Sequence, residues 1–357
     1  MAARNAADLP RSIVPLTLPA APDTRSLAAF RAACPAVLAR PDRSGLTRPE
    51  DWATPCEAAQ SATSPTAFFS AHFTAVRLGD GKGFATGYFE PEIAASRTPG
   101  PGYATPLYRR PPDLVEADLG LFRPEWRGRT LRGQIKGQKI TPYPTRKAIA
   151  EGALAGQRLE LAWAADANAA FFLEIQGSGR LRLPDGTIMR IGYDSQNGRD
   201  YVAIGRVLRD QGKLEPPISM SSILDWLRSH PVEAPAIRAA NPSQIFFREL
   251  TGLSPEQGPI GALGHPLTPR VSAAVDPAFT PYGAPLLVTR PGEPVMLQIA
   301  ADTGGAIRGP GRIDMFRGPS PLDSGAAASE AGNLASSIDI TLLLPNAAAA
   351  RLQDKAR

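Results

Sequence analysis

The sequence predicts a mainly β protein with helices, organised in two domains. Its 357 residues are enough for a large core and favour two domains over one. Short runs of alternating apolar and polar residues, broken by glycine or proline, fill residues 84–195 and return after residue 242. The 37 prolines and 33 glycines are spread along the chain without a repeat, which is typical of many turns and short strands. We therefore expect two β blocks, built as separate barrels or sheets, with a cleft for a ligand between them.

The N-terminal part of the chain is predicted to be helical. Residues 24–40 and 52–78 repeat apolar positions at three and four, and Gly79 follows the second segment as a stop signal. The run GDGKG at 79–83 lacks the strand–loop–helix context and the Lys-Ser/Thr ending of a phosphate-binding loop. We read it as a hairpin turn.

The first β block covers residues 84–195. Its clearest hairpin is LRLPDGTIMRIGY, in which Asp185-Gly186 separates two alternating arms. The run FFLEIQGSG that precedes this hairpin is also read as β, and PTRKAIAEGALAG as a short helix that interrupts the block. Three helices are expected next, over residues 200–212, 219–230 and 233–240, the last stopped by Asn241-Pro242.

The second β block follows residue 242. Its predicted strands are QIFFREL, RVSAAVD, APLLVTR, VMLQIAAD, RIDMF and IDITLLLP. Residues 319–337 are small and polar, and we expect a loop there with one helical turn.

Composition narrows the classes of partner. The net charge of +5 and the pI of about 9.4 favour a partner that carries carboxylates or other anions. The cations form no long run and no stripe interleaved with aromatic residues, so we expect no nucleic-acid partner. Three scattered histidines (His72, His230 and His265) and two cysteines do not have the spacing of a zinc site, and we expect no metal and no other cofactor.

Cys34 and Cys56 allow two interpretations. They are either two buried thiols or one disulfide that ties two N-terminal helices together. A disulfide implies an oxidising compartment.

Three aspartates in the second β block are candidates for chemistry. Asp276 and Asp302 lie where a predicted strand ends, and Asp314 lies inside RIDMF. Aspartates at strand ends also cap turns by accepting hydrogen bonds from backbone N–H groups, and that alternative stays open for each.

Several motifs together resemble the membrane-bound lytic murein transglycosylase A (MltA) family. They are GYFEP, EIQGSG, GYDSQNGRDYVAIGRVL, NPSQIFFRE, AAVDPAFTPYGAPLLV and ADTGGAIRGPGRIDMF, and the resemblance covers residues 80–345. It implies a double-psi β-barrel catalytic domain formed by residues 1–95 together with 241–357. It also implies a β-rich substrate-binding barrel, residues 96–240, inserted into the first domain, with a groove between the two.

The resemblance implies a peptidoglycan lytic exotransglycosylase, a carbon–oxygen lyase that needs no cofactor. Such an enzyme cuts the β-1,4 bond between N-acetylmuramic acid and N-acetylglucosamine. The 6-hydroxyl of the muramoyl residue attacks its own C1 and leaves a 1,6-anhydro ring. The resemblance makes Asp314 the single acid/base, whereas most glycosidases need two carboxyl groups. One carboxyl suffices because the nucleophile is tethered within the substrate.

The acid must start protonated, so burial or nearby negative charge should raise its pKa. Asp302 and Asp276 would order the site or raise the pKa of Asp314. Glycines between Asp302 and Asp314 would let the backbone bend and approach a sugar. The substrate-binding residues expected are Gln176, Gly177, Ser178 and Gly179 of the EIQGSG motif, with Tyr88, Tyr193, Asn197 and Gly304. For Tyr88, Tyr193 and Asn197 a role in the core or in a turn stays open as the alternative.

The expected partner is the peptidoglycan glycan strand. The implied location is the periplasm, with outer-membrane association through a leader that is not visible in this chain. Two other functions stay open: a glycoside hydrolase that pairs Asp302 and Asp314, and a peptidoglycan-binding protein without turnover. An aspartic protease is disfavoured because only one Asp-Thr-Gly, at Asp302, is present. End or interior cleavage and the oligomeric state also stay open.

Overall fold

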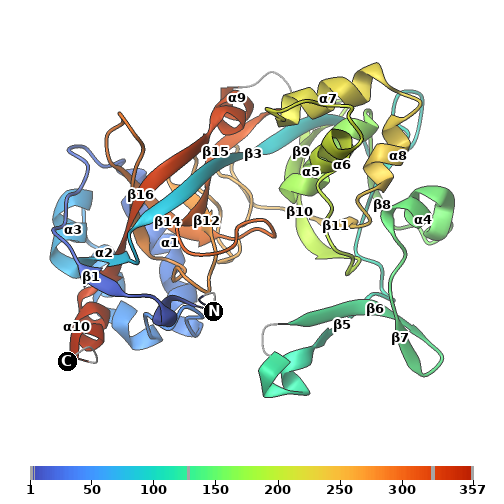
Figure 1. Ribbon diagram of the computed structural model, residues 1–357. Helices are drawn as coiled ribbons and strands as arrows, with labels where there is room; N and C mark the ends of the chain where they lie inside the picture. Colours follow the sequence, from blue (N-terminus) through green and yellow to red (C-terminus); the bar gives the residue numbers. More distant parts are fainter. Residues whose placement is uncertain (1–2, 4, 127–128, 323–325, 355–357) are drawn as a thin grey trace. The chain divides into compact units, whose positions relative to one another are not determined.

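The computed structural model describes residues 3, 5–126, 129–322 and 326–354 (Figure 1). The chain divides into two compact units. Unit 1 comprises Met1–Phe89, Leu253–Gly318 and Ala326–Arg357, and unit 2 comprises Glu90–Gly252 and Pro319–Gly325. The boundaries between the units therefore lie between residues 89 and 90 and between residues 252 and 253. The boundaries expected from the sequence lie between residues 95 and 96 and between residues 240 and 241. The groove expected between the domains stays a prediction.

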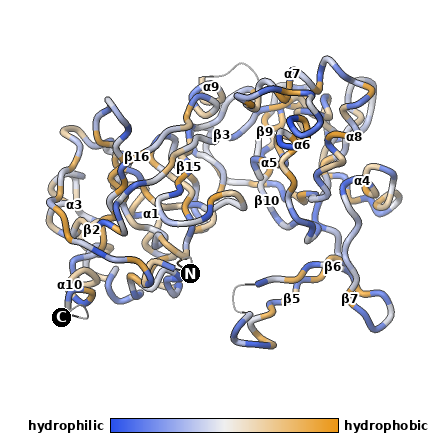
Figure 2. The backbone as a smooth tube through the Cα atoms, viewed as in Figure 1, coloured by the Kyte–Doolittle hydropathy of each residue, from blue (hydrophilic) through white to orange (hydrophobic). Residues whose placement is uncertain are grey.

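Unit 1 is built on a closed ring of strands. In ring order these are β3 (Lys82–Ser96), β16 (Ala335–Pro345), β13 (Pro285–Thr289), β14 (Met296–Asp302), β12 (Ser272–Val275) and β15 (Arg312–Pro321), which neighbours β3 again. β12 and β14 run parallel, whereas β12–β15, β13–β14, β13–β16 and β16–β3 are antiparallel. Aliphatic side chains of these strands form a buried core, including those of Val275, Leu286, Ile313, Met315 and Ile338. Hydrophobic positions recur along these strands in Figure 2.

Two strands extend the ring and correct one sequence expectation. β2 (Phe73–Leu78) pairs with β16, and β1 (Arg11–Ile13) pairs with β2. The helix expected over 52–78 is therefore wrong in its last part. Phe73 and Val76 are buried as the pattern requires, but they are buried in a strand, because pairing with β16 overrides the local helical spacing.

Short helices pack on unit 1. They are η1 (Ala6–Asp8), α1 (Arg25–Ala39), η2 (Pro49–Trp52), α2 (Ala53–Ala59), α3 (Pro65–His72), α9 (Ala326–Asn333) and α10 (Asn346–Asp354). Phe30 of α1 lies at the centre of an aromatic cluster with Trp52, Phe68, Phe69 and Phe73. A disulfide joins Cys34 of α1 to Cys56 of α2, so the bonded alternative holds.

The loop expected over 319–337 is largely wrong. β15 continues to Pro321, α9 occupies Ala326–Asn333, and β16 begins at Ala335. Small residues hid this helix from the sequence pattern, because its buried face is made of alanines rather than large apolar side chains.

Unit 2 contains a second ring. The C-terminal part of β3 pairs with β9 (Ser178–Arg182) on one side and with β8 (Glu160–Ala164) on the other. β9 pairs with β10 (Ile188–Gln196), β10 with β11 (Ile245–Glu249), and β8 with β4 (Thr105–Tyr108). A bridge between Arg109 and Phe247 connects the β4 and β11 sides. The second β block of the sequence prediction therefore begins, at β11, inside unit 2.

Helices α4 (Arg146–Ala148), η5 (Ile149–Ala153), α5 (Ala167–Gln176), α6 (Ile204–Asp210), α7 (Met220–Ser229) and α8 (Ala234–Ala239) complete most of unit 2. The β interpretation of FFLEIQ is wrong, because these residues end α5. Asp166 caps its start and Gly177, at φ 76°, ends it. A short apolar run cannot be assigned to strand or buried helix by periodicity alone.

Unit 2 also contains a separate three-stranded sheet. It consists of β5 (Val115–Asp118), β6 (Thr130–Lys136) and β7 (Lys139–Thr141), with η3 (Leu119–Leu121) and η4 (Pro124–Trp126) at one end. Among the described residues of both units, no helix has the length and apolar character needed to cross a membrane.

Candidate active site

Two of the three candidate aspartates lie at one level of unit 1. Ala274 of β12 pairs with Asp302 of β14 on one side and with Asp314 of β15 on the other. Directly paired residues point their side chains to the same face of a sheet, and two strand spacings amount to about 10 Å between Cα atoms. The glycine run thus returns the chain so that both carboxyl groups face the same side.

Asp314 has one direct partner and one oxygen left over. Its Oδ1 accepts a hydrogen bond from the Thr86 hydroxyl at 2.7 Å, and Thr86 Oγ1 in turn accepts one from Arg312 Nη2 at 2.9 Å. Within the described parts of the chain, no donor reaches Oδ2. The protein therefore holds Asp314 through Oδ1 and leaves Oδ2 without a hydrogen bond from the described residues.

The pKa of Asp314 is raised to about 6. The largest cause is removal of the carboxyl group from water, and the negative charge of Asp302 adds to it. The hydrogen bond from Thr86 and the charges of Arg312 and Arg317 act in the opposite direction. A carboxyl group with this pKa is substantially protonated in mildly acidic solution, as an acid catalyst requires.

Asp302 is held at both oxygens. Oδ1 accepts the Ala262 N–H and Oδ2 accepts the Tyr88 hydroxyl, each at 2.9 Å. Burial raises the pKa of Asp302, and these donors lower it in part. Burial together with the charge of Asp302 raises the pKa of Tyr88 well above its usual value, so Tyr88 stays a neutral donor. The Tyr88 ring lies 5.2 Å from that of Phe316, centroid to centroid. The Tyr88 hydroxyl group is thus used by Asp302, and the expected contact of Tyr88 with substrate stays a prediction.

Asp276 fastens the glycine run. It is 7 % exposed, and its Oδ1 accepts the Ala278 N–H at 3.0 Å while Oδ2 accepts the Gly309 N–H at 2.8 Å. Both oxygens are thus used by the backbone. The sequence suggested several roles for Asp276. These contacts support two of them, the capping of a turn and the ordering of the site.

The last glycines of the run serve contacts within the chain. Gly311 has φ 67°, and a Cβ there would lie 2.5 Å from the Lys82 carbonyl oxygen. A Cβ on Gly83 would lie 2.2 Å from the Gly311 oxygen. The start of β15 can therefore approach β3 only with glycine on both strands. At Gly304 the nearest atom to a Cβ would be a side-chain carbon of Ile307 at 3.2 Å, and the expected sugar contact there stays a prediction.

The EIQGSG motif lies in unit 2 and divides into two parts. Gln176 ends α5 and lines a cavity of about 370 Å³ between α5, α6 and α7, together with Phe172, Tyr201, Arg206, Met220 and Ile223. Gly177 provides the left-handed turn that ends α5. These two residues lie at the surface, where a ligand can reach them.

Ser178 and Gly179 are buried in β9, and their expected contact with substrate stays a prediction. Ser178 is 9 % exposed. A Cβ on Gly179 would lie 2.5 Å from Leu173 Cδ1 and 2.9 Å from the Pro91 oxygen. The small residues therefore make room for α5 and β3 of the same unit. Tyr193 of β10 is 44 % exposed, and its expected role stays a prediction.

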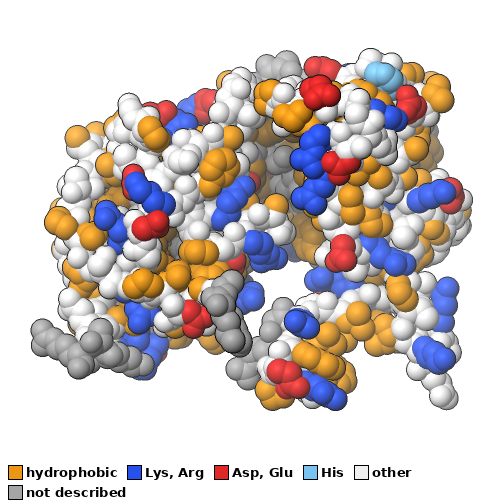
Figure 3. Space-filling view, in the orientation of Figure 1, with side chains coloured by type: hydrophobic (Ala, Val, Ile, Leu, Met, Phe, Trp, Pro, Cys, Tyr) orange, Lys and Arg blue, Asp and Glu red, His pale blue; other side chains and the backbone are white. Residues whose placement is uncertain are grey.

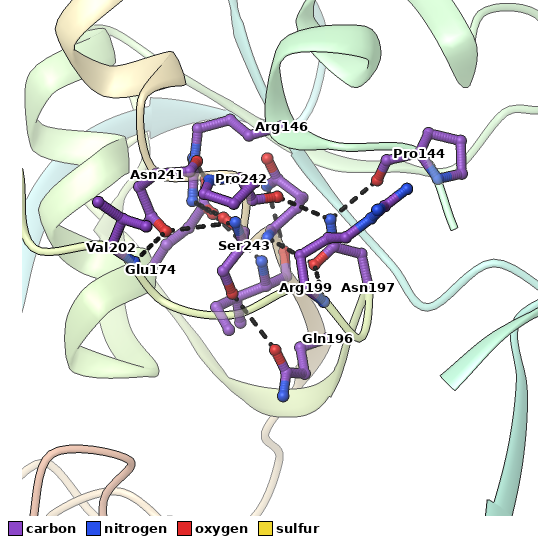
Figure 4. Close-up of polar contacts among 12 residues, drawn as sticks. Pro144, Arg146, Glu174, Gln196, Asn197, Arg199, Val202, Asn241, Pro242 and Ser243 are labelled. Atoms are coloured by element: carbon purple, nitrogen blue, oxygen red, sulfur yellow. Dashed lines mark hydrogen bonds and ion pairs between the residues drawn. The ribbon is translucent and has the colours of Figure 1, made fainter. Parts of the chain in front are cut away.

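The contacts of Asn197 favour the structural role that the sequence left open for it (Figure 4). It is 0 % exposed, and its Nδ2 donates to the carbonyl oxygens of Pro144 and Pro242 at 2.8 and 2.9 Å. Its Oδ1 accepts the N–H groups of Arg199 and Gln244 at 3.3 and 3.0 Å. All its hydrogen-bonding capacity is used within unit 2, so no group of Asn197 is left for a sugar.

A buried ion pair beside Asn197 supports the end of α5 (Figure 4). Arg146 donates to both carboxylate oxygens of Glu174, at 3.2 and 2.8 Å. Glu174 also accepts the Ile245 N–H of β11 at 3.2 Å. Because Glu174 lies two residues before Gln176, this pair fixes the turn that presents Gln176. The pair was not predicted, since nothing in the sequence matches Arg146 with a carboxylate so far along the chain.

Thr86 and Arg312 were also missed. Both could be inferred from strand alternation, because Thr86 lies two residues before Tyr88 and Arg312 two before Asp314, which places each pair on one face. In the ranges that the structure describes, no three or more His, Cys, Asp or Glu side chains gather as metal ligands would. Exposed Lys and Arg side chains on the face seen in Figure 3 lie in small groups among acidic and apolar ones.

The fold and the site define a class of protein. It has two rings of strands and an acidic site on the ring of unit 1. Two family models match the chain, the MltA specific insert domain over residues 84–248 and the 3D domain over residues 271–344. The ring of unit 1, which contains the 3D match, is a double-psi β-barrel, and the predicted fold class is confirmed.

Named relatives agree with these models. The membrane-bound lytic murein transglycosylase A of Vibrio cholerae is 31 % identical over 249 residues, 66 % of this chain and 59 % of that protein. The crystal structure of membrane-bound lytic murein transglycosylase from Agrobacterium tumefaciens is 34 % identical, with a TM-score of 0.80 over 92 % of this chain and 95 % of that one. MltA from Neisseria gonorrhoeae is 33 % identical, with a TM-score of 0.76 over 90 % and 88 %.

The chain belongs to the MltA family. It spans about three fifths of the length of the curated relatives that it matches.

Proposed function

We propose that this protein is a lytic transglycosylase that cleaves the β-1,4 bond between N-acetylmuramic acid and N-acetylglucosamine in peptidoglycan. Membership of the MltA family and the names of its relatives support the reaction class. The single observation in this chain that carries the proposal is Asp314, a partly buried carboxyl group whose pKa is raised to about 6 and whose Oδ2 accepts no hydrogen bond from the residues that the structure describes.

One carboxyl group can perform both proton transfers. Protonated Asp314 gives its proton to the oxygen that leaves C1 of the muramoyl residue, and the C1–O bond breaks. The resulting carboxylate then takes the proton of the 6-hydroxyl as that oxygen bonds to C1, which closes the 1,6-anhydro ring and restores the acid. No water is consumed. The attacking group belongs to the substrate, so its effective concentration is high without a second catalytic carboxylate.

Asp302 fits a supporting role better than that of a second catalyst. Its two oxygens already accept hydrogen bonds from Ala262 and Tyr88, which anchor the carboxylate to the protein. Its negative charge helps to raise the pKa of Asp314. These contacts favour the lytic reaction over a hydrolase in which Asp302 would activate water.

Glycan strands are the proposed substrate, and Gln176 is the first candidate to bind them. Its amide can donate to and accept from sugar hydroxyl and acetamido groups. The cavity that it lines is largely apolar and includes Tyr201 in its lining, as suits the faces of a sugar ring. Chitohexaose is bound in a crystal structure of E. coli MltA, a chain 24 % identical to this one whose likeness shows the fold. That oligosaccharide is therefore a suitable first probe.

A periplasmic location is proposed as well, with association to the outer membrane. The disulfide between Cys34 and Cys56 supports an oxidising compartment. The relatives are named as membrane-bound proteins.

The test is digestion of purified peptidoglycan by the wild type and by Asp314→Asn, with mass spectrometry of the products and a parallel glycan-binding assay. We expect 1,6-anhydromuramoyl ends from the wild type, and binding without cleavage from Asp314→Asn. The exposed Asp225 of α7 offers a matched control, Asp225→Asn, which should cleave normally. Reducing ends would instead indicate a hydrolase, and binding without turnover by the wild type would indicate a non-catalytic protein. Product lengths will separate cleavage at strand ends from cleavage within strands.

A further inference from the structure

Arg312 is anchored by neutral groups rather than by a carboxylate. Its Nη1 donates to the carbonyl oxygens of Phe84, at 3.4 Å, and Ile313. Its guanidinium carbon lies 5.7 Å from the centroid of the Phe84 ring. Nη2 donates to Thr86 Oγ1 at 2.9 Å. Among the described residues no Asp or Glu lies within ion-pair distance of it. The charge is thus held against β3 and β15 in a fixed orientation.

This anchoring fixes the direction of the hydrogen bonds. A guanidinium group donates and never accepts, so a lone pair of Thr86 Oγ1 faces Arg312. Thr86 Oγ1 has a second lone pair, but the guanidinium charge beside it polarises the hydroxyl group towards donating, and the acceptor in reach among the described residues is Asp314 Oδ1 at 2.7 Å. Oδ1 is therefore favoured as an acceptor in both protonation states of Asp314. The acid proton of Asp314 then resides on Oδ2.

We propose that Arg312 is a positioning residue which, through Thr86, keeps the proton of Asp314 on Oδ2, the oxygen left free for the substrate. The proposal rests on the proposed function for its consequence in catalysis, but the geometry that carries it does not depend on the substrate.

Loss of Arg312 would release this arrangement. The Thr86 hydroxyl could then rotate and accept a proton from Oδ1 of Asp314, because a hydroxyl group both donates and accepts. The acid proton would spend part of its time facing β3 instead of the substrate. Lysine would keep the charge but not the fork that contacts two carbonyl groups and Thr86 together. Arg312→Lys thus tests the orientation of the Thr86 hydroxyl group while the positive charge at position 312 is kept.

The other charged and titratable groups that act around Asp314 are not altered by these substitutions. They are Asp302 on β14, Tyr88 on β3, and Arg317 on β15. Asp276, at the end of β12, is bound to backbone N–H groups.

The kinetic test compares Arg312→Lys, Thr86→Val and the double variant on peptidoglycan glycan strands. Each single variant should lower kcat about tenfold or more, with KM changed less than about twofold, since misplacing a general acid affects the chemical step. The double variant should be no slower than Thr86→Val, because both changes remove one arrangement. Thr86→Ser keeps the hydroxyl and should retain most of kcat, and Arg11→Met, on β1, controls for loss of one exposed cation. Wild-type kcat in Arg312→Lys, or losses that multiply in the double variant, would overturn the proposal.

A second readout needs no turnover. The ¹³C signal of the Asp314 carboxyl group can be titrated in four proteins. They are the wild type, Arg312→Met, Thr86→Val and the double variant that carries both substitutions. Arg312→Met should raise the titration midpoint more when Thr86 is present than in Thr86→Val, because only then does it also release the hydroxyl. Equal shifts in the two backgrounds would contradict the coupling. If the wild type forms no anhydro product, the proposed function fails, whereas this titration still decides whether Arg312 acts through Thr86.

Discussion

Replacing Asp314 with asparagine should stabilise the protein at neutral and alkaline pH while removing its activity. The pKa of Asp314 rises from 3.8 to about 6 on folding, so the folded state binds its proton more tightly than the unfolded chain does. The stability that this group contributes is fully present below the unfolded pKa and is lost as pH rises through the folded pKa. About two pKa units correspond to about 3 kcal/mol of free energy of unfolding. Asparagine never ionises, so it avoids that loss, and its carbonyl oxygen can still accept from Thr86.

Urea unfolding of the wild type and Asp314→Asn at pH 4 and pH 8 measures this effect. Fluorescence of Trp52, buried in unit 1, can report the transition of the unit that holds the site, in a background where the other three tryptophans are replaced by phenylalanine. We expect the variant to be more stable by about 3 kcal/mol at pH 8 and nearly equal to the wild type at pH 4. Asp225→Asn, at an exposed position, should show no such dependence. If Asp314→Asn were less stable at pH 8, or equally shifted at both pH values, the reasoning about its buried charge would be refuted.

Three further outcomes are expected. Asp302→Asn should move the alkaline limb of the rate profile to lower pH, since the charge of Asp302 raises the pKa of Asp314; a limb that stays or moves upward would contradict this. Cys34→Ser with Cys56→Ser should lower the free energy of unfolding by about 3 kcal/mol in urea, because the bond closes a short loop between positions 22 residues apart. Asn197→Ala should lower the melting temperature of unit 2 without weakening glycan binding by the protein that remains folded, since its amide is spent on the backbone; weaker binding by the folded variant would restore its role as a ligand.

The acids of the site could be predicted from the sequence because their motif is local. Asp302 and Asp314 stand at the two ends of one glycine-rich run, and the strands on either side of it are read from alternation. The contacts that tune them are not local. Thr86, Tyr88 and Ala262 come from segments far along the chain, and only the closed ring brings them to the carboxyl groups.

What the sequence left wrong or open has two origins. Phe73–Leu78 looks helical by spacing but joins β16, a strand near the other end of the chain. FFLEIQ is apolar enough for a strand, yet lies in α5. Asn197 resembles a ligand-binding amide until the backbone groups of two distant loops are seen around it. For Phe73–Leu78 and Asn197 a partner remote in sequence decides the outcome, which local pattern cannot supply. For FFLEIQ the pattern itself is ambiguous, because a short apolar run fits a strand and a buried helix equally well.

The most direct test of the central claim is the fate of water during cleavage. Purified glycan strands digested in ¹⁸O-labelled water, with the products analysed by mass spectrometry, show whether the new muramoyl end incorporates solvent oxygen. If Asp314 works alone with the substrate's own hydroxyl as nucleophile, that end is unlabelled and one water lighter than a reducing end. Incorporation of ¹⁸O at the muramoyl C1 would mean hydrolysis, and a mechanism with two carboxyl groups would then replace catalysis by Asp314 alone.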